Sequence, residues 1–272
     1  MRLWYVIFYL KKMLIATWNI NSVRIRLQII EGWIKERKPD IILLQEIKCE
    51  NDSFPKSFFE NFGYACQING EKGKNGVAIL IKKSCHLGNY SVSNFDFNKS
   101  SQARVIELNF DNKLYILSLY APNGNPITDK TKFSLKNLWY KNLFKYTRNL
   151  FNDESDIILG GDFNVLEGEN DVIDINNWKN DALGCDETIY NFRKVLSNGF
   201  TNIVRIFKDQ KNCFSFWDYQ NSSWERNYGL LIDHFLVSPR MLERTKEFGI
   251  DSHLRGHEKP SDHVPVWINL NI

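Results

Sequence analysis

Acidic residues at the ends of short apolar runs constrain this 272-residue sequence more than any other feature. Four acids each end, interrupt or directly precede a run made almost entirely of apolar residues. These residues are Glu46, Asp162, Asp233 and Asp262. Burying a carboxylate beside an apolar strand is costly unless the carboxylate is paired or bound to a cation. The pattern therefore predicts buried strands whose ends converge on one polar site.

The apolar runs also predict the architecture. Strands are expected at 14–18, 41–44, 77–81, 104–110, 114–120, 157–159, 230–237 and 264–270. Helices with an apolar stripe are expected at 24–38, around 135–150 and at 188–197. Strands that are apolar on both faces need a covering layer on each side. Since some connections are helical and one is a hairpin turn expected at Asp111–Asn112, we expect a layered α/β sandwich with mixed sheets.

The composition is that of a globular protein. Apolar residues make up 43% and charged residues 25% of the sequence, which excludes a disordered, collagen-like or coiled-coil chain. The net charge of +3 permits a polyanionic partner without arguing for one. No repeat, low-complexity linker or proline-rich hinge divides the sequence. We therefore predict a single domain at 13–272.

Residues 1–12 are interpreted as an N-terminal extension, with Met13 as an alternative start. The apolar stretch 3–10 is far shorter than the roughly 20 residues that span a bilayer. No small-residue cleavage site follows it, so a signal peptide is not expected. An extra edge strand and a surface anchor are the alternative roles. We expect no membrane partner and a cytoplasmic location.

The five cysteines are scattered and form no C-x-x-C pair. They are Cys49, Cys66, Cys85, Cys185 and Cys213. This pattern argues against a disulfide framework and against a zinc ribbon. We interpret all five as reduced packing residues.

Polar residues at the remaining strand ends enlarge the predicted site. Asn19 follows the first strand, Tyr120 ends another, and Asn164 and His263 stand next to the acids. The resulting donors are carboxylate and amide oxygens with one imidazole, which suit Mg²⁺ or Mn²⁺ and do not suit zinc. A hard cation, a carboxylate base and an imidazolium beside an acid are the parts needed to hydrolyse a phosphodiester.

Six motifs in order support this chemistry by resemblance. They are Trp18-Asn19-Ile20-Asn21, Leu44-Gln45-Glu46, Tyr120-Ala121-Pro122-Asn123-Gly124, Gly161-Asp162-Phe163-Asn164, Ile232-Asp233-His234 and the segment from Lys259 to Trp267. With them the sequence resembles the exonuclease III family of apurinic/apyrimidinic endonucleases, from about residue 13 to the C-terminus. The resemblance implies a four-layered α/β sandwich of the deoxyribonuclease I-like kind, with two mixed sheets packed face to face and helices outside. The strand pattern agrees with this fold.

The resemblance also implies a role for each matched residue. The implied metal shell is Asn19, Glu46, Asp162, Asn164, Asp262 and His263, with Glu46 as the principal ligand. The implied catalytic residues are Tyr120, Asp162, Asn164, Asp233 and His263. In these roles Asp162 activates or orients the attacking water, and Asp233 fixes the tautomer and charge of His263. Tyr120 hydrogen-bonds the scissile phosphate.

Substrate-binding residues are implied in the same way. They are Asn123, which contacts phosphate, and Phe216, Trp217, Leu230 and Ile232, which line a small apolar pocket for a base-less sugar. Such a pocket would accept a flipped abasic nucleotide and exclude a normal one. Ordinary core packing is the alternative for the aromatic residues. His234 is expected to face away from the site, because side chains alternate along a strand.

Two positions depart from the family pattern. The family usually has Arg where this sequence has Leu231, and Gly where it has Ser22. Neither position belongs to the implied metal shell. Activity is therefore expected, and any effect of these departures would fall on substrate affinity.

The leading interpretation is a Mg²⁺-dependent DNA-repair hydrolase, with Mn²⁺ as a substitute metal. It would cleave double-stranded DNA 5′ to an abasic site, leave a 3′-hydroxyl, and act at 3′ ends as an exonuclease or end-trimming enzyme. We expect a monomer. The alternatives are a phosphatase or sphingomyelinase relative and a catalytically inactive DNA-binding module. The segment 259–267, Tyr120 and the complete set of acids favour the first interpretation.

Overall fold

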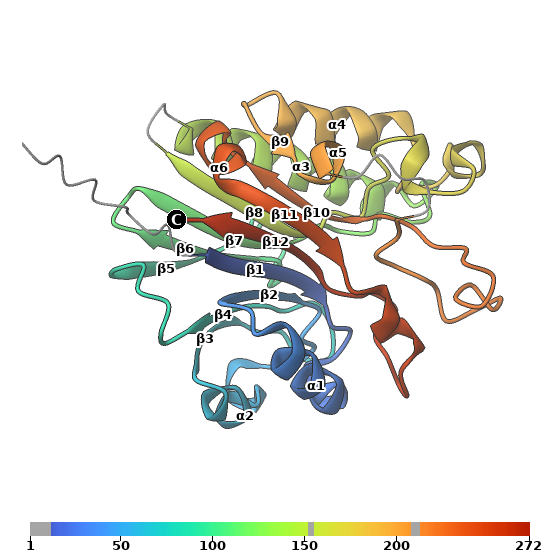
Figure 1. Cartoon of the computed structure of the whole chain (residues 1–272). Helices are drawn as coiled ribbons and strands as arrows, with labels where there is room; N and C mark the ends of the chain where they lie inside the picture. Colours follow the sequence, from blue (N-terminus) through green and yellow to red (C-terminus); the bar gives the residue numbers. More distant parts are fainter. Residues whose placement is uncertain (1–11, 152–154, 208–212) are drawn as a thin grey trace, which may run out of the picture.

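The computed structural model describes residues 12–151, 155–207 and 213–272, and two six-stranded sheets form its centre (Figure 1). The first sheet has the order β11 (Thr245–Ile250), β12 (Val266–Asn271), β1 (Lys12–Asn19), β2 (Ile41–Gln45), β4 (Val77–Lys82) and β3 (Tyr64–Asn69). The second has the order β5 (Tyr90–Phe95), β6 (Val105–Phe110), β7 (Leu114–Tyr120), β8 (Asp156–Asp162), β10 (Asp233–Val237) and β9 (Thr201–Asn202).

Both sheets are mixed, as the sequence predicted. β1 pairs with β2 in parallel, and β7 pairs with β8 in parallel. The neighbouring pairs, such as β1 with β12 and β8 with β10, are antiparallel. The parallel strands β2 and β8 are buried along their whole length, because they lie at the centre of the two sheets.

The sheets pack face to face and are covered by helices on their outer sides (Figure 1). Ile15 and Leu43 of the first sheet meet Ile158 and Phe235 of the second in one apolar core. The helices α1 (Leu27–Arg37) and α2 (Lys56–Asn61) cover the outer face of the first sheet. The helices α3 (Lys130–Leu150) and α4 (Asp186–Leu196) cover that of the second. The expected four-layered α/β sandwich is therefore confirmed.

Short elements complete the fold. They are the helices α5 (Val204–Phe207) and α6 (Pro239–Arg244) and the 3-10 turns η1 (Val23–Ile25), η2 (Asn51–Ser53), η3 (Glu169–Asp171), η4 (Ile175–Trp178) and η5 (Ser252–Gly256). The helix expected at 24–38 begins at Leu27, because η1 precedes it as a separate turn. The Asp111–Asn112 turn is confirmed, since both residues have a positive φ, 50° and 56°, and the backbone N–H of Lys113 donates to the carbonyl of Phe110 at 2.9 Å.

The strand expected at 230–237 is shorter than predicted. Regular pairing begins only at Asp233. Leu230 instead forms isolated bridges to Val172 and Phe216, which lie outside the main sheet. The chain therefore runs across the end of the sandwich before it enters β10.

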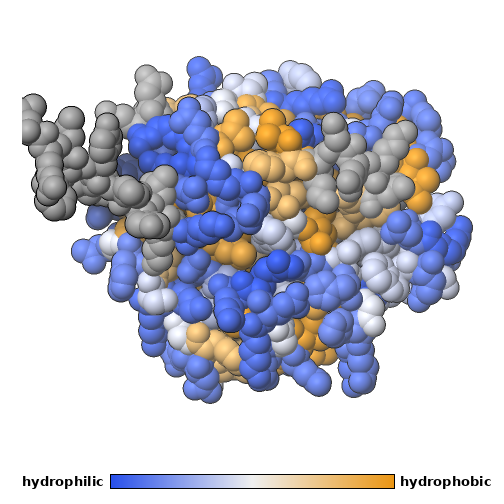
Figure 2. Space-filling view, in the orientation of Figure 1, coloured by the Kyte–Doolittle hydropathy of each residue, from blue (hydrophilic) through white to orange (hydrophobic). Residues whose placement is uncertain are grey.

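The predictions for the N-terminal extension fall on residues 1–11, which lie outside the described residues, and on Lys12, which begins β1. All five cysteines are free, as expected. Within the described ranges, no helix combines the length and apolarity needed to cross a bilayer. Figure 2 shows polar and charged side chains over most of the face seen in Figure 1, with smaller apolar groups between them.

Candidate active site

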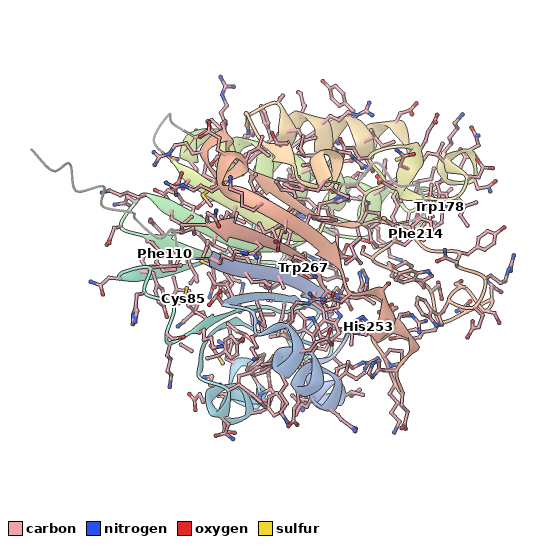
Figure 3. All side chains as sticks on the ribbon, viewed as in Figure 1. Cys85, Phe110, Trp178, Phe214, His253 and Trp267 are labelled. Atoms are coloured by element: carbon pink, nitrogen blue, oxygen red, sulfur yellow. The ribbon has the colours of Figure 1, made fainter. Side chains whose placement is uncertain are left out.

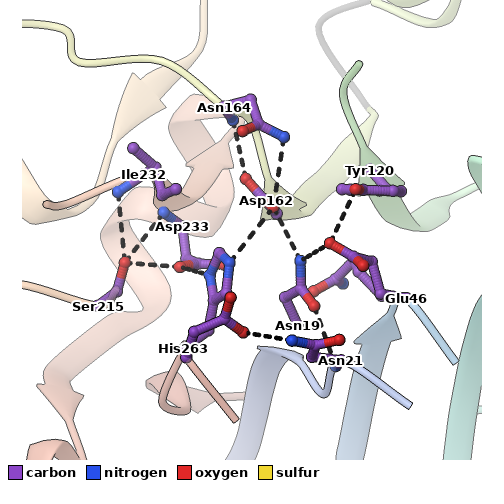
Figure 4. A network of polar contacts seen from close by, with 12 residues as sticks. Asn19, Asn21, Glu46, Tyr120, Asp162, Asn164, Ser215, Ile232, Asp233 and His263 are labelled. Carbon is purple, nitrogen blue, oxygen red and sulfur yellow. Dashed lines mark hydrogen bonds and ion pairs between the residues drawn. The ribbon is translucent and has the colours of Figure 1, made fainter. Parts of the chain in front are cut away.

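Four strand ends bring the predicted polar residues together between the two sheets (Figure 4). Asn19 ends β1, Tyr120 ends β7, Asp162 ends β8 and Asp233 begins β10. Tyr120 and Asp233 both lie opposite Asp162 in the register of the second sheet. The parallel strands β7 and β8 end at the same edge of the second sheet, and the antiparallel strand β10 begins there. The residues at these strand ends therefore lie close together.

Glu46 is the centre of one half of the site. Its Oε1 accepts hydrogen bonds from Asn19 Nδ2 at 2.9 Å and from the Tyr120 hydroxyl at 2.8 Å. Its Oε2 lies 2.8 Å from Lys48 Nζ. Burial alone would raise the pKa of Glu46, but these three donors together lower it below its usual value. The Glu46 carboxylate is therefore ionised at neutral pH and available to a cation.

Asn19 holds two carboxylates at a fixed separation. Its Nδ2 donates to Glu46 Oε1 and to Asp162 Oδ2, both at 2.9 Å. Its Oδ1 accepts the backbone N–H of Asn21 at 3.1 Å. Asn19 thus acts here as a hydrogen-bond donor that links Glu46 and Asp162.

Asp162 is almost completely buried in the middle of the site. Its Oδ1 accepts the backbone N–H of Asn164 at 2.9 Å, and its Oδ2 lies 3.8 Å from His263 Nε2. Burial raises the pKa of Asp162 to about 7, with the charge of His263 opposing this shift and the charge of Asp233 adding to it. A carboxylate that titrates near neutral pH has the proton affinity that general base catalysis requires.

Asp233 and His263 form the expected pair. His263 Nδ1 lies 2.8 Å from Asp233 Oδ2, and Ser215 Oγ donates to the same oxygen at 2.6 Å. Burial would lower the pKa of His263, but the charge and the hydrogen bond of Asp233 raise it to about 10. The ring is therefore an imidazolium at neutral pH. An imidazolium has no free lone pair, so this geometry favours phosphate stabilisation by His263 over metal ligation.

Asn123 and Asn164 lie side by side on the loops after β7 and β8. Asn123 Nδ2 donates to Asn164 Oδ1 at 3.3 Å, and Asn164 Nδ2 donates to the carbonyl of Ala121 at 2.9 Å. Beneath them the Lys136 ammonium donates to the carbonyls of Asn123, Asn164 and Ala182 at 2.9, 2.7 and 2.8 Å. Lys136 is fully buried, and this burial lowers its pKa to about 7.

Sequence reasoning missed Lys136, Lys48 and Ser215. Lys136 lies on the apolar stripe of α3, three residues before the buried Trp139. A lysine at such a position was the one feature of the sequence that indicated a buried charge. Lys48 follows Glu46 by two residues and links it to a further acid: Lys48 Nζ lies 2.5 Å from Asn21 Oδ1, and Asn21 Nδ2 donates to Asp262 Oδ1 at 2.9 Å.

The residues present fit a hard divalent cation. Oxygens of Asp162 and Asp233 and a nitrogen of His263 lie within 4.8 Å of one another, but the Asp233–His263 hydrogen bond already uses two of these groups. Glu46 and Asp162 face each other across Asn19. Asp233 Oδ1 is buried and lacks a hydrogen-bond partner among the described residues. Carboxylate oxygens dominate this set, which is the ligand type that Mg²⁺ and Mn²⁺ prefer.

The predicted sugar pocket is only partly assembled. Phe216, Leu230 and Ile232 form one apolar cluster, and the Phe216 ring lies 4.8 Å from the His263 ring. Trp217 lies outside this cluster, in the core packing that the sequence analysis named as the alternative for the aromatic residues. It is buried on the opposite side, where it contacts the Trp224 ring at 4.9 Å. The neighbours Phe216 and Trp217 therefore pack into two different apolar clusters.

His234 faces away from the site, as expected, and packs against Phe163 and Phe192. Of the two family departures, Ser22 adopts φ 83° and ψ 99°, a conformation that glycine accepts more readily. Leu231 is buried, and its backbone N–H donates to the carbonyl of Asp171 at 2.8 Å.

Comparisons with known proteins agree with this geometry. The Endonuclease/Exonuclease/phosphatase family matches residues 16–263. Exodeoxyribonuclease III of Haemophilus influenzae is 31% identical over 266 residues, which span 92% of this chain and 97% of that protein. The exodeoxyribonuclease of Bacillus subtilis is 28% identical, over 96% of this chain and 100% of that protein.

Two solved structures are also similar to this chain. An AP endonuclease from Archaeoglobus fulgidus has a TM-score of 0.88 and 31% identity, over 96% of this chain and 100% of that one. The 3′-5′ exonuclease NExo from Neisseria meningitidis has a TM-score of 0.87 and 30% identity, with the same coverage of 96% and 100%. The chain therefore belongs to the endonuclease/exonuclease/phosphatase family and, within it, to the exodeoxyribonuclease III-like hydrolases that act on DNA.

Proposed function

We propose that the protein cleaves duplex DNA on the 5′ side of abasic sites to leave a 3′-hydroxyl, and that it also trims 3′ ends and removes 3′-terminal nucleotides. The observation that carries this proposal is the continuous chain from Glu46 through Asn19 and Asp162 to His263. It combines an ionised carboxylate, a carboxyl group that titrates near neutral pH and an imidazolium within one buried site. These are the groups that phosphodiester hydrolysis needs.

The residues divide the reaction between them. Asp162 orients the attacking water and takes its proton, because its pKa of about 7 lets it exist as the carboxylate. His263, held by Asp233, donates to a phosphate oxygen and stabilises the charge that develops there. Tyr120, Asn123 and Asn164 supply further donors around the phosphate.

Glu46, Asp162 and Asp262 would hold the metal, with Mg²⁺ as the expected ion and Mn²⁺ as its substitute. When bound, such an ion neutralises phosphate oxygens and stabilises the leaving alkoxide. We further propose that the enzyme works as a monomer, with abasic duplexes and 3′ ends as its DNA partners. A reduced, cytoplasmic environment is consistent with five free cysteines.

A strand-cleavage assay tests the proposal. The substrates are a duplex with one synthetic abasic site and the matched intact duplex, each with Mg²⁺ and with EDTA. Metal-dependent incision 5′ to the lesion, which spares the interior of the intact strand, is the expected result. Cleavage confined to 3′ ends would reduce the activity to that of an exonuclease. No cleavage with either Mg²⁺ or Mn²⁺ would refute the proposal.

A further inference from the structure

We propose that the chain carries a subsite for an intact nucleobase, next to the pocket predicted for the base-less sugar. This inference rests on the DNA cleavage proposed above. The subsite is a pocket of about 220 Å³ whose walls include Trp178, Tyr228 and Leu230. Leu230 is the one wall residue that also belongs to the predicted sugar pocket, so it connects the two.

A ladder of backbone pairings connects this pocket to His263. Phe216 pairs with His263, Leu230 with Phe216, and Val172 with Leu230, all antiparallel. Directly paired residues project their side chains on the same face of a ladder. The contact of the Phe216 ring with the His263 ring, 4.8 Å between centroids, agrees with this. The four side chains therefore form one shelf that leads from the imidazolium to the pocket.

The length of the shelf matches an extruded nucleotide. Neighbouring segments of such a ladder lie about 4.8 Å apart, so two pairings place Leu230, the near wall of the pocket, roughly 10 Å from the His263 backbone, and three pairings place Val172 roughly 14 Å away. A phosphate held at His263 places its sugar over Phe216 and Leu230. A base on that sugar extends past Leu230, toward Trp178 and Tyr228. A nucleotide that keeps its base can therefore occupy the same shelf as a base-less sugar.

Both walls of the pocket are held in place. Besides the Val172–Leu230 bridge, the backbone N–H of Leu231 donates to the carbonyl of Asp171 at 2.8 Å. On the other side, Gly184 approaches Trp178 so closely that a Cβ at residue 184 would lie 2.6 Å from the Trp178 Cβ. A pocket that is formed in advance binds its ligand at a lower ordering cost.

The chemistry of the walls fits one base of a DNA strand. Trp178 (Figure 3) is half-buried and Tyr228 is 53% exposed, and aromatic faces stack on bases whatever their identity. The Arg226 guanidinium lies 4.5 Å from the Tyr228 ring centroid, where its charge can meet the phosphate backbone. Asn177 lines the same pocket and offers an amide to the edge of a base. A nucleobase on an anionic DNA strand would match the aromatic walls, the positive charge and the amide.

Substitution of Tyr228 tests the subsite by its selectivity. Tyr228→Ser should lower kcat/KM on a duplex with an intact 3′-terminal nucleotide by roughly 5- to 100-fold, the loss of one base–aromatic stack. Its kcat/KM on an abasic-site duplex should stay unchanged. Ile173→Trp, which places a larger side chain in the lining of the same pocket, should produce the same selective loss. The matched control is Tyr190→Ser: Tyr190 is 59% exposed and has Lys194 over its ring, but lies on α4.

A binding measurement in EDTA supplies a second readout that needs no cleavage. Fluorescence anisotropy compares two duplexes, one with an unpaired intact 3′ nucleotide and one with a base-less sugar at the same position. The wild type should bind the intact end more tightly, and Tyr228→Ser should abolish the difference. Equal losses on both substrates, or no selective effect of either pocket variant, would overturn the subsite. Failure of the proposed cleavage would instead appear as an inactive wild type in the Mg²⁺ assay.

Discussion

His263 Nδ1 lies 2.8 Å from Asp233 Oδ2 in a pocket that buries both residues almost completely. Asp233 makes His263 an imidazolium, and this charge is what the site offers to a phosphate oxygen. Ser215 completes the arrangement, because its hydroxyl donates to the same carboxylate oxygen at 2.6 Å. One acidic residue therefore sets both the charge and the orientation of the ring.

This pair should make stability depend on pH. The pKa of His263 is raised from 6.5 to about 10, so the folded state binds more protons than the unfolded state between these values. The stabilisation is present in full below pH 6.5 and is lost as the pH rises toward 10. Denaturant titrations of metal-free wild type and His263→Gln across this range measure it. The stability difference between them should shrink as pH rises; a constant difference would contradict the assignment.

Asp162→Asn should reduce turnover by about 10²- to 10⁴-fold, the usual contribution of a general base. The amide cannot take a proton from water, yet it can keep the hydrogen bond with Asn19. Binding of abasic DNA should therefore remain close to that of the wild type. Single-turnover cleavage and anisotropy measure the two effects separately. A near-normal rate would show that another group accepts the proton.

Glu46→Gln should raise the Mg²⁺ concentration needed for half-maximal activity. The substitution removes a charge whose pKa the surrounding donors keep low, and it leaves a weaker neutral ligand. Activity of the wild type should disappear in EDTA and return with Mg²⁺ or Mn²⁺. A metal titration of both proteins, read as cleavage rate, tests this. An unchanged midpoint would remove Glu46 from the metal shell.

Lys136→Met should destabilise the protein by about 3 kcal/mol or more, because three backbone carbonyls, two of them in buried hydrogen bonds, would lose their donor. Urea denaturation measures the loss. The control is Lys145→Met on the exposed side of the same helix, which should change stability by less than about 0.5 kcal/mol. Similar effects of the two substitutions would show that the Lys136 hydrogen bonds contribute little.

Ser22→Gly should stabilise the protein by about 1 kcal/mol, since Ser22 adopts φ 83° and ψ 99° at a cost that glycine avoids. The more flexible unfolded chain of the glycine variant offsets part of this gain. Thermal unfolding should show a midpoint about 2–4 °C higher. Ser57→Gly in α2 is the matched control, and the ordinary helical backbone there predicts a small loss instead. A lower midpoint for Ser22→Gly would contradict the strain.

The hydrophobic pattern of the sequence determined the layered fold and the inventory of the site. Buried strands and amphipathic helices follow from local periodicity, and Glu46, Asp162 and Asp233 are conspicuous because a carboxylate at an apolar strand is costly. Both the periodicity and the position of an acid beside an apolar run can be recognised from a few neighbouring residues. The six motifs added the expected role of each residue.

Only the tertiary structure decided which partners these residues have. Ser215 donates a hydrogen bond to Asp233, and Lys136 donates to the carbonyls of Asn123 and Asn164. These partners are remote in sequence, so no local pattern predicts their hydrogen bonds. Irregular segments also lack the fixed alternation of strands. For this reason the structure alone placed Phe216 beside His263 and Trp217 in the opposite core. The physical reason is that long-range packing, and no local pattern, selects which face of an irregular segment is buried.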